Sequence, residues 1–512
     1  MIIRLGNVNL SLEGDIPSEV SDEIRKTLSY VFPGYEFTAR YKQDQMLAAK
    51  NLLPEGKRPW DGVKTVTRWK RGGGIIAPTG LYSYMKEILN KYNIPFRVLD
   101  ERPAPDVTGG WSTSDELVLR DYQTGPIDEG LNRQRGVLQV ATGGGKTLMM
   151  VVMFARAGVF PAIFYVPNCD LLIQAHDMLE KFVRKDGKPV KVGMVGGGHF
   201  DLQPITVATI QTAERSLSGL FTKFDELSTD DKTDLDTSQK TVLNDFIRSC
   251  QMVAIDEAHH TSCETIQTIM NNSHAARYRF GMSASPWRDD GLDILIEAAF
   301  GRKICEISAS FLIEKGYLVP PLITFNHFNQ ALGPAGNFNS HYTRYVVENE
   351  ARNKFIAGEA IKYSKDKGLP TIILVKWSRH GEILADLIED CEVLTSSGKK
   401  KRSPKKRKKV LDKMRSREVK CIIATTLLDE GVDVPSASVG IFAGGGKSST
   451  RALQRVGRFI RPDLIDPNKK NAIIVEIADH TKWLNHHAKL RRKILKTEPR
   501  FVITDNSDTL KL

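Results

Sequence analysis

The chain has 512 residues, 41% hydrophobic and 26% charged, which is enough apolar material for two or three separate cores. Its 73 Lys and Arg against 61 Asp and Glu give a formal net charge of +12, which favours a polyanionic partner: nucleic acid first, an anionic membrane surface second. No apolar run approaches the ~20 residues that span a bilayer, and the N-terminus lacks the order of a signal peptide, so we expect a cytoplasmic protein without a membrane partner.

The first hundred residues, 1–102, are predicted to form a small α+β domain. They end in a polar stretch, Glu101–Pro105, whose two prolines are typical of a linker. From about Leu117 onward, short runs rich in Val, Ile and Phe alternate with helix-patterned stretches, which indicates parallel sheets covered by helices. Buried strands are predicted at 162–166, 252–255, 371–375, 421–424 and 471–477. The series is too long for one open sheet, so two α/β domains are predicted, 103–308 and 309–512.

A glycine-rich segment follows the strand predicted at 136–140. Backbone N–H groups of such a loop can wrap a phosphate, and the N-terminus of the following helix adds a positive dipole. Lys146 could reach the terminal phosphates, and the Thr147 hydroxyl could ligate magnesium. Val140 stands where the strict phosphate-loop pattern has its first glycine, so a plain flexible turn is the alternative. The candidate nucleotide-binding residues are Thr142, Gly143, Gly144, Gly145, Lys146 and Thr147.

Two acidic residues, Asp256 and Glu257, end the strand predicted at 252–255. The carboxyl ends of parallel strands face the crevice in which open α/β sheets bind ligands. Asp256 could hold magnesium through water, and Glu257 could orient or deprotonate the water that attacks a γ-phosphate. An isolated acidic pair would more often be a solvated cap. Its occurrence after the glycine segment favours the catalytic interpretation.

A basic segment near the end of the second α/β domain contains Gln454, Arg458 and Arg461. Two arginines three positions apart lie on one face of a helix, where they could clamp a phosphoryl group in transfer. The alternative is a basic surface helix. An earlier turn, 425–435, carries Gly431 and Asp433, which could reach the sugar of a nucleotide.

Taken together, these segments resemble the superfamily 2 helicases, of the DEAH type by Asp256-Glu257-Ala258-His259, over about residues 117–480. The resemblance implies two RecA-like parallel-sheet domains in tandem, ATP and Mg²⁺ as cofactors, and arginine fingers at Arg458 and Arg461. It further implies adenine recognition by Arg120 and Gln123, and coupling of hydrolysis to strand movement by His259, Ser283 and Ser285. The residues implied to grip the nucleic-acid backbone are Pro167, Gln174, Gly197, Thr209 and Gln211.

The N-terminal hundred residues resemble the small N-terminal domain of phage branch-migration helicases of the UvsW type, through segments around Trp60, Tyr82 and Tyr92. An unrelated small α+β domain with an exposed tryptophan is the alternative. The resemblance implies 3′ to 5′ tracking on branched DNA such as forks, Holliday-type junctions and R-loops, in phage recombination or repair. Trp60 is then a candidate nucleic-acid contact, the partner is DNA or an RNA–DNA hybrid, and a monomer is favoured.

A run of nine basic residues in eleven, 399–409, lies inside the second α/β domain. Such a run should not pack in a core, and it repels itself unless it meets phosphate or solvent. A nuclear localisation signal or a solvated loop is the alternative to the interpretation that we prefer, a phosphate-contacting loop that uses Lys405, Lys406 and Arg407.

Three other functions stay open at this point. The chain could be a duplex translocase or restriction-type motor that does not separate strands. It could also be an RNA helicase, because backbone-gripping motifs do not distinguish the sugar. A nucleic-acid annealing protein with a vestigial ATP site is the third, and the presence of Lys146, Asp256, Glu257 and Arg458 argues against it.

Overall fold

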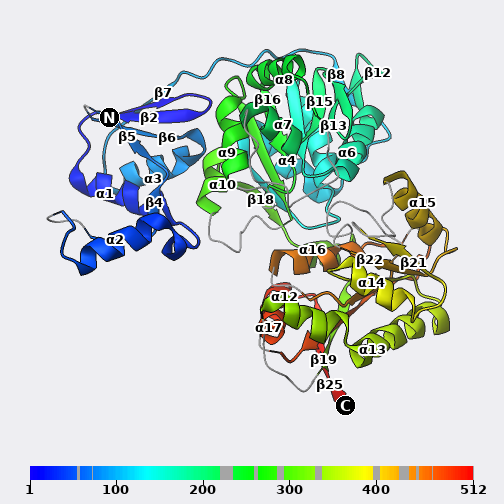
Figure 1. The fold of residues 1–512 in the computed structure, drawn as a ribbon. Coiled ribbons are helices and arrows are strands. Elements are labelled where there is room, and N and C mark those ends of the chain that lie inside the picture. Colours follow the sequence, from blue (N-terminus) through cyan, green and yellow to red (C-terminus); the bar gives the residue numbers. More distant parts are fainter. Residues whose placement is uncertain are drawn as a thin grey trace. The chain divides into compact units, whose positions relative to one another are not determined.

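The computed structural model describes residues 1–54, 58–71, 73–218, 234–258, 263–284, 293–328, 337–395, 404–425, 437–445, 449–463, 465–481 and 483–510. By their contacts these residues form two compact units (Figure 1). The first unit is Met1–Val140 with Lys146–Glu306, and the second is Ala141–Gly145 with Ile307–Leu512. No helix in the described ranges is both long and apolar enough to cross a bilayer. The domain boundaries at 102 and 308 stay predictions.

The N-terminal region of the first unit is built on a five-stranded mixed sheet, in the order β5-β6-β2-β1-β7. Its core gathers apolar side chains of the sheet and of two helices, and Ala298 of helix α10 joins them. Ala298 belongs to the following α/β region, so the small domain is completed by the larger one. The elements are β1 (Ile2–Leu5), β2 (Asn9–Glu13), α1 (Ser18–Thr27), β5 (Arg68–Trp69), β6 (Ile75–Pro78), η2 (Thr79–Leu81), α3 (Tyr82–Lys91) and β7 (Arg97–Asp100).

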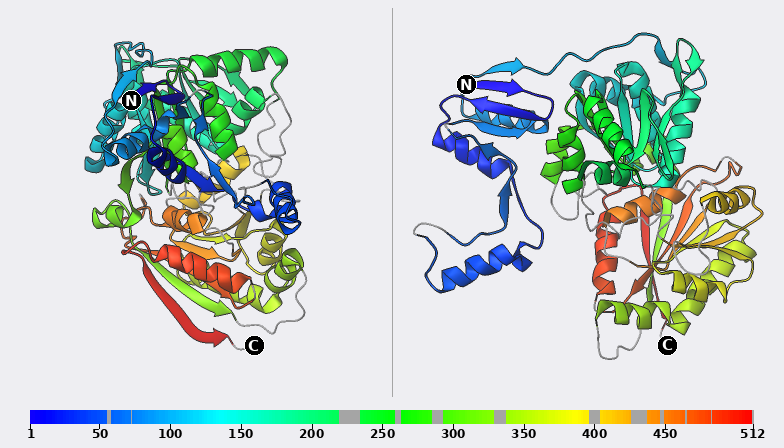
Figure 2. Two further views of the ribbon diagram at one scale, coloured as in Figure 1. Left: turned by 90° about the vertical axis from the view of Figure 1, so that its left-hand side faces the viewer. Right: turned by 45° about the horizontal axis from the view of Figure 1, so that its top comes forward.

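A small excursion between α1 and β5 lies apart from this sheet, as the right-hand view of Figure 2 shows. It comprises the two-stranded sheet of β3 (Ser29–Val31) and β4 (Val63–Thr65), the short η1 (Tyr35–Phe37) and helix α2 (Ala39–Ala49). Helix α2 has no buried residue, and Phe37 is 78% exposed. The excursion therefore has almost no core of its own.

The large sheet of the first unit has eight strands in the order β14-β13-β15-β10-β16-β17-β9-β18. The six from β13 to β9 run parallel. Buried side chains of Ile163, Tyr165, Val253 and Ile255 fill the core beneath the covering helices. The strands are β9 (Arg135–Val140), β10 (Ala162–Val166), β13 (Gly193–Gly196), β14 (His199–Asp201), β15 (Ile205–Thr209), β16 (Met252–Ile255), β17 (Tyr278–Ser283) and β18 (Lys303–Ile307).

Helices connect these strands in the alternating pattern predicted from the sequence. They are α4 (Asp121–Arg133), α5 (Lys146–Ala157), α6 (Cys169–Phe182), α7 (Ile210–Ser218), α8 (Thr237–Ser249), α9 (Cys263–Asn272) and α10 (Asp293–Phe300). A further small sheet joins β8 (Trp111–Thr113), β11 (Val183–Lys185) and β12 (Lys188–Pro189). Helix α8 begins at Thr237 because Asp236 caps it by accepting from the Gln239 N–H. Residues 219–233 lie outside the described ranges.

The second unit contains a seven-stranded parallel sheet in the order β21-β22-β20-β23-β24-β19-β25. Its strands are β19 (Pro321–Phe328), β20 (Thr371–Leu374), β21 (Cys391–Leu394), β22 (Cys421–Ala424), β23 (Val439–Phe442), β24 (Ala472–Asp479) and β25 (Val502–Leu510). The helices include α11 (Ala309–Glu314), α12 (Phe338–Tyr342), α13 (Glu350–Ile361), α14 (Ser378–Ala385), α15 (Pro404–Arg415), α16 (Ser449–Phe459) and α17 (Leu484–Leu495), with π-helical turns at Thr343–Val347 and Lys362–Asp366. The predicted fold class, two large parallel sheets in tandem with a small α+β domain, is confirmed.

Two buried ion pairs hold helices of the second unit to its sheet. Arg352 of α13 is fully buried and donates from Nε to Asp479 Oδ1 at 2.7 Å and from Nη2 to Asp479 Oδ2 at 3.0 Å. Arg491 of α17 binds Glu476 in the same two-pronged way. Both acids lie on β24, so the pairs fix the two helices against one strand.

Candidate nucleotide and nucleic-acid site

The predicted motifs of the first unit lie along one edge of its large sheet. Five neighbouring parallel strands, β15, β10, β16, β17 and β9, end at Thr209, Val166, Ile255, Ser283 and Val140, and β13 ends at Gly196. The glycine loop follows β9, and the acidic pair follows β16. The segments proposed to grip nucleic acid follow β10, β13 and β15. Nucleotide candidates thus occupy one end of this carboxyl edge and nucleic-acid candidates the other. Ser283 lies at the nucleotide end, on β17 between β9 and β16.

The glycine loop turns sharply from β9 into α5. Gly143 and Gly145 adopt φ of 86° and 82°, in the left-handed region that favours glycine, and the Gly144 N–H donates to the Ala141 carbonyl at 2.9 Å. Helix α5 begins at Lys146, two residues before the predicted Leu148. Lys146 and Thr147 therefore occupy the first turn, where unpaired N–H groups and the helix dipole favour an anion.

Lys146 and Glu257 meet although 111 residues separate them in the sequence. The Lys146 Nζ lies 3.1 Å from the Glu257 Oε1, and the two side chains are 10% and 19% exposed. Glu257 adopts a φ of +48°, which is rare for a residue with a side chain and therefore strained. This conformation places an unusual turn directly after β16. The positive φ of Glu257 could not be predicted from the sequence.

Asp256, the other acidic residue, is buried, with 4% exposure. Burial, and then the negative charge of Glu257, raise the pKa of its carboxyl to about 7. Lys146 and the Glu257 N–H, which donates to Asp256 Oδ1 at 2.9 Å, oppose that shift. A carboxyl whose pKa lies near neutral pH, at the edge of a sheet where ligands bind, is a marker of a functional site.

Arg120 and Gln123, the predicted adenine readers, lie at the start of α4. The Arg120 N–H donates to Gln123 Oε1 at 2.9 Å, and Arg120 Nη1 donates to the Tyr122 hydroxyl at 3.1 Å. Gln123 is 1% exposed. The pair thus forms the N-terminal cap of the helix, and its role in adenine recognition stays a prediction.

Among the candidate nucleic-acid contacts, Pro167 and Gln211 are joined directly, since Gln211 Nε2 donates to the Pro167 carbonyl at 2.8 Å. Thr209 is fully buried and donates to the Thr212 hydroxyl at 2.9 Å. Gln174 and Gly197 are exposed. Thr209 is therefore placed to hold the start of α7, while Gln174 and Gly197 are accessible to a ligand. Their contact with nucleic acid stays a prediction.

Of the proposed coupling residues, Ser283 ends β17 and is buried, whereas His259 and Ser285 lie outside the described residues. The same holds for Gly431 and Asp433, the proposed sugar contacts.

The arginine segment lies in the second unit. Gln454 and Arg458 lie in α16, and Gln454 is 5% exposed. The prediction that Arg458 and Arg461 share one helical face is wrong, because α16 ends at Phe459 and Arg461 follows in the chain beyond it. The Ile460 carbonyl accepts from the Val319 N–H at 2.8 Å instead of continuing the helix.

The basic run was predicted as a loop, and its described part is helix α15. Arg407 is only 6% exposed, so the expectation that no part of the run packs inward is also wrong. Lys406 and Lys409 are exposed, as a helix with one inward face requires. The residues before Pro404 and the side chain of Lys405 lie outside the described residues.

Trp60, the N-terminal candidate, belongs to the excursion around α2. Its ring is half-buried, Nε1 donates to the Val63 carbonyl at 2.8 Å, and the Arg40 guanidinium lies 4.6 Å from the ring centre. Aromatic rings interleaved with cations are what single-stranded nucleic acid stacks against. Whether Trp60 binds nucleic acid stays a prediction.

The arginines at the junction between the N-terminal sheet and the large sheet, chiefly Arg135 and Arg302, were not predicted from the sequence. Arg135 begins β9, and Arg302 precedes β18. Neither belongs to a motif, so no pattern in the sequence marked them.

Two family models match consecutive parts of the chain. The one described as type III restriction enzyme, res subunit, matches residues 116–288, and the helicase conserved C-terminal domain matches residues 353–463. Together with the two parallel sheets and the order of the motifs, these matches identify the chain as a superfamily 2 helicase. The predicted class of ATP-dependent enzyme is thereby confirmed.

Individual relatives are distant. The chain is 26% identical over 414 residues to the DNA 3′-5′ translocase XPB2 of Sulfurisphaera tokodaii, which covers 74% of this chain and 84% of the relative. It is 22% identical over 478 residues to the ATP-dependent DNA helicase uvsW of Enterobacteria phage T4, with 87% and 85% covered. Among solved structures, the ATP-dependent Type ISP restriction-modification enzyme LlaBIII bound to DNA matches with a TM-score of 0.51 at 14% identity, covering 77% of this chain and 32% of that one, and supports the fold alone.

Proposed function

We propose that this protein is an ATP-driven motor that moves 3′ to 5′ along DNA, using the edge of the first sheet to bind nucleotide at one end and DNA at the other. The observation that carries the proposal is the ion pair between Lys146, which directly follows the glycine loop, and Glu257, which directly follows the buried Asp256. The likeness to a relative named as a 3′-5′ DNA translocase supports the choice of DNA and of translocation.

The Lys146–Glu257 pair gives the site a resting state. Both side chains are largely buried, and each neutralises the other. An incoming triphosphate offers Lys146 a stronger anionic partner, so we expect Lys146 to move to the phosphates and Glu257 to be released toward the attacking water. Glu257 then acts as the general base, and its strained backbone keeps the carboxylate aimed at the site.

Magnesium fits the residues present. Mg²⁺ is bound through one or two carboxylates together with substrate phosphates and waters, and it needs no dedicated protein cage. The buried Asp256 carboxyl and the Thr147 hydroxyl would hold it, and the bound ion would neutralise charge on the β- and γ-phosphates. Because the pKa of Asp256 is about 7, this carboxyl releases a proton on taking up a cation at neutral pH.

Arg458 and Arg461 are proposed to stabilise the charge that develops on the γ-phosphate. The support is chemical: guanidinium groups match phosphate geometry, and Arg458 extends from a helix of the second unit. Because Arg461 follows the end of α16, its backbone is less constrained than that of Arg458. We therefore expect Arg458→Ala to lower kcat more than Arg461→Ala does.

The first experiment is an ATPase measurement on the full chain with single-stranded, duplex, forked, four-way and RNA–DNA hybrid substrates. We expect DNA to stimulate hydrolysis and Glu257→Gln to lower kcat by about 10²–10⁴-fold while DNA binding is retained. The matched control is Glu264→Gln, an exposed glutamate at the start of α9. Full activity in Glu257→Gln would refute the assignment.

Action on branched DNA is a second candidate. The alignment with a phage DNA helicase covers 87% of the chain, and the weakly buried excursion around α2 offers Trp60 and Arg40 as an additional surface. A triplex-displacement assay beside a forked-substrate assay separates the two functions. Triplex displacement without fork unwinding favours translocation alone, and unwinding of both forks and four-way junctions favours the branched-DNA role.

A further inference from the structure

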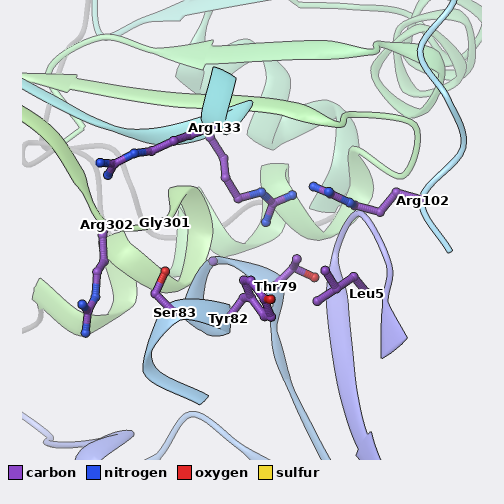
Figure 3. Close-up of a pocket in the computed structure, with 10 residues that line it drawn as sticks. Leu5, Thr79, Tyr82, Ser83, Arg102, Arg133, Gly301 and Arg302 are labelled. Atoms are coloured by element: carbon purple, nitrogen blue, oxygen red, sulfur yellow. The ribbon is translucent and has the colours of Figure 1, made fainter. Parts of the chain in front are cut away.

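A pocket of about 340 Å³ lies in the first unit where the N-terminal region meets the large sheet (Figure 3). Thr79, Tyr82 and Ser83 of the N-terminal region lie across this space from Arg102 and Arg133. Its size is at the lower end of the volumes of small-ligand pockets, which begin at about 300 Å³. Arg135 lines it from the first residue of β9, at the opposite edge of the sheet from the glycine loop, so the pocket is separate from the ATP site.

Positive charge gathers around this pocket. Four arginines line it: Arg102, Arg133, Arg135 and Arg302. The charges of Arg277 and Arg279 also act on Arg135. The carboxylates that pair with them are fewer. Arg102 and Arg277 share Asp100, with Nη2–Oδ2 distances of 2.8 and 3.2 Å, Arg302 binds Glu87, and Arg133 binds Glu129.

Arg135 carries the uncompensated charge. Its Nη2 donates to the Asn7 carbonyl at 3.0 Å, and within the described ranges no carboxylate lies at ion-pair distance from it. Its Nε is buried without a hydrogen-bond partner, as is the Nε of Arg302. Burial, together with the positive charges of Arg279, Arg102 and Arg277, lowers the pKa of Arg135 well below its usual value. Neighbouring Arg279 donates hydrogen bonds to the carbonyl oxygens of Ala276, Met270 and Ser273, so these contacts bring no negative charge to Arg135.

Arg135 is half-buried, and its buried Nε–H is an unused donor, which is costly unless an acceptor meets it. Arginine presents donors in a fork that matches the oxygens of a phosphate. We infer that the pocket between the N-terminal region and the large sheet is a phosphate-binding site, in which Arg135, Arg102 and Arg133 hold a phosphate group at the edge of the sheet opposite to the ATP site.

The phosphate has two possible sources with the same chemistry: the backbone of a nucleic-acid arm, or a free phosphate compound. The first source rests on the proposed function, and the second does not. In either case the ligand bridges two parts of the first unit, because Ser83 and Tyr82 belong to the N-terminal region whereas Arg133 ends α4 and Arg135 begins β9 of the large sheet. Binding should therefore stabilise the docking of the N-terminal region.

The test uses the full chain and four variants, of which Lys146→Ala serves only in the phosphate titration. Arg135→Gln removes the unpaired charge, and Ser83→Glu adds a carboxylate to the pocket wall while it leaves every arginine in place. Arg248→Gln is the matched control, since Arg248 is a surface arginine of α8 with Asp245 as its partner at 3.4 Å. Thermal melts identify any variant that does not fold, in which case Ser83→Glu carries the test.

For the nucleic-acid source, forked-DNA affinity is measured across a salt series. We expect Arg135→Gln and Ser83→Glu to weaken binding about three- to tenfold at low salt, and to reduce the slope of log K against log salt by about 0.7–0.9, the loss of one phosphate contact. Arg248→Gln should leave both unchanged. DNA-stimulated kcat at saturating DNA should also be unchanged in Arg248→Gln.

For the free source, inorganic phosphate is titrated in thermal melts of Lys146→Ala, which removes the phosphate affinity of the ATP site. A concentration-dependent rise in the melting temperature that Arg135→Gln abolishes supports the inference. Unchanged salt slopes together with no phosphate-dependent stabilisation would overturn it, even if ATPase stimulation by DNA is normal. Absence of DNA stimulation in the wild type would instead overturn the proposed function and leave the phosphate titration decisive.

Discussion

Asp256 should make the affinity for Mg·ATP depend on pH. Its carboxyl has a pKa of about 7 in the nucleotide-free protein, and a magnesium ligand must be ionised. About 9% of the carboxyl is ionised at pH 6 and about 91% at pH 8, so the apparent affinity should rise about tenfold between them, equivalent to about 1.4 kcal/mol. The cause is the desolvation of Asp256 and the neighbouring charge of Glu257.

Titration calorimetry in buffers of different ionisation enthalpy measures both the affinity and the protons released. ATP itself titrates near this range, so each wild-type value is divided by that of Asp256→Asn in the same buffer. That ratio should rise about tenfold from pH 6 to pH 8, and close to half a proton should be released at pH 7 by the wild type only. If this ratio of affinities does not change with pH, the argument that Asp256 is protonated without nucleotide and binds the cation in its ionised form is refuted.

The same shift predicts how stability depends on pH. The folded-state pKa lies above the usual 3.8, so between about pH 4 and pH 7 the folded protein binds more protons than the unfolded chain does, and stability falls as the pH rises through this window. The complete displacement from 3.8 to about 7 corresponds to about 4 kcal/mol. Asp256→Asn should be more stable than wild type at pH 8 and should lose the slope.

Three further predictions follow from other contacts. Arg352→Met should destabilise the second unit by about 3–5 kcal/mol in urea unfolding, because it leaves Asp479 buried without its partner, whereas Arg379→Gln at the exposed pair with Glu348 should cost about 0–1 kcal/mol; equal costs would contradict the burial argument. Replacing Lys406 and Lys409 by Ser should weaken DNA binding and flatten its salt dependence, unlike replacement of the paired Lys354 and Lys365; identical salt series would exclude α15 from the DNA contact. Gly80→Ala should loosen the N-terminal region, since an added Cβ would lie 2.2 Å from the Glu297 carbonyl oxygen, and hydrogen exchange in α3 should rise, whereas Gly358→Ala, with open space around it, should leave exchange there unaltered.

The strands could be predicted closely because parallel strands buried on both faces are continuous apolar runs. The predictions at 162–166, 252–255 and 421–424 coincide with β10, β16 and β22. The prediction at 371–375 is one residue longer than β20, and that at 471–477 starts one residue before β24 and stops two residues short of its end. The glycine loop could also be predicted, because its positive φ values favour glycine and the sequence has glycine at these positions.

Features that depend on distant partners were not predictable. The basic run is followed by three apolar residues, Val410, Leu411 and Met414, which are buried. Their burial against the rest of the second unit stabilises the segment as a helix despite the repulsion between its charges. The end of α16 is set by the backbone bond from Val319 to Ile460, across 141 residues of sequence. The charge on Arg135 is uncompensated only because residues near positions 7, 102 and 279 converge on it, which no local pattern encodes.

The order of strands in the first sheet has a mechanical consequence. Strand β17, which carries Ser283, is hydrogen-bonded on both sides, to β9 and to β16, so it cannot slide without breaking two ladders at once. From β9 to β13 the edge spans five strand spacings, about 24 Å, and each strand along it is hydrogen-bonded to its neighbours, so the edge is rigid. An enzyme built on such an edge cannot take a step by shortening it, so displacement has to come from segments outside these six strands.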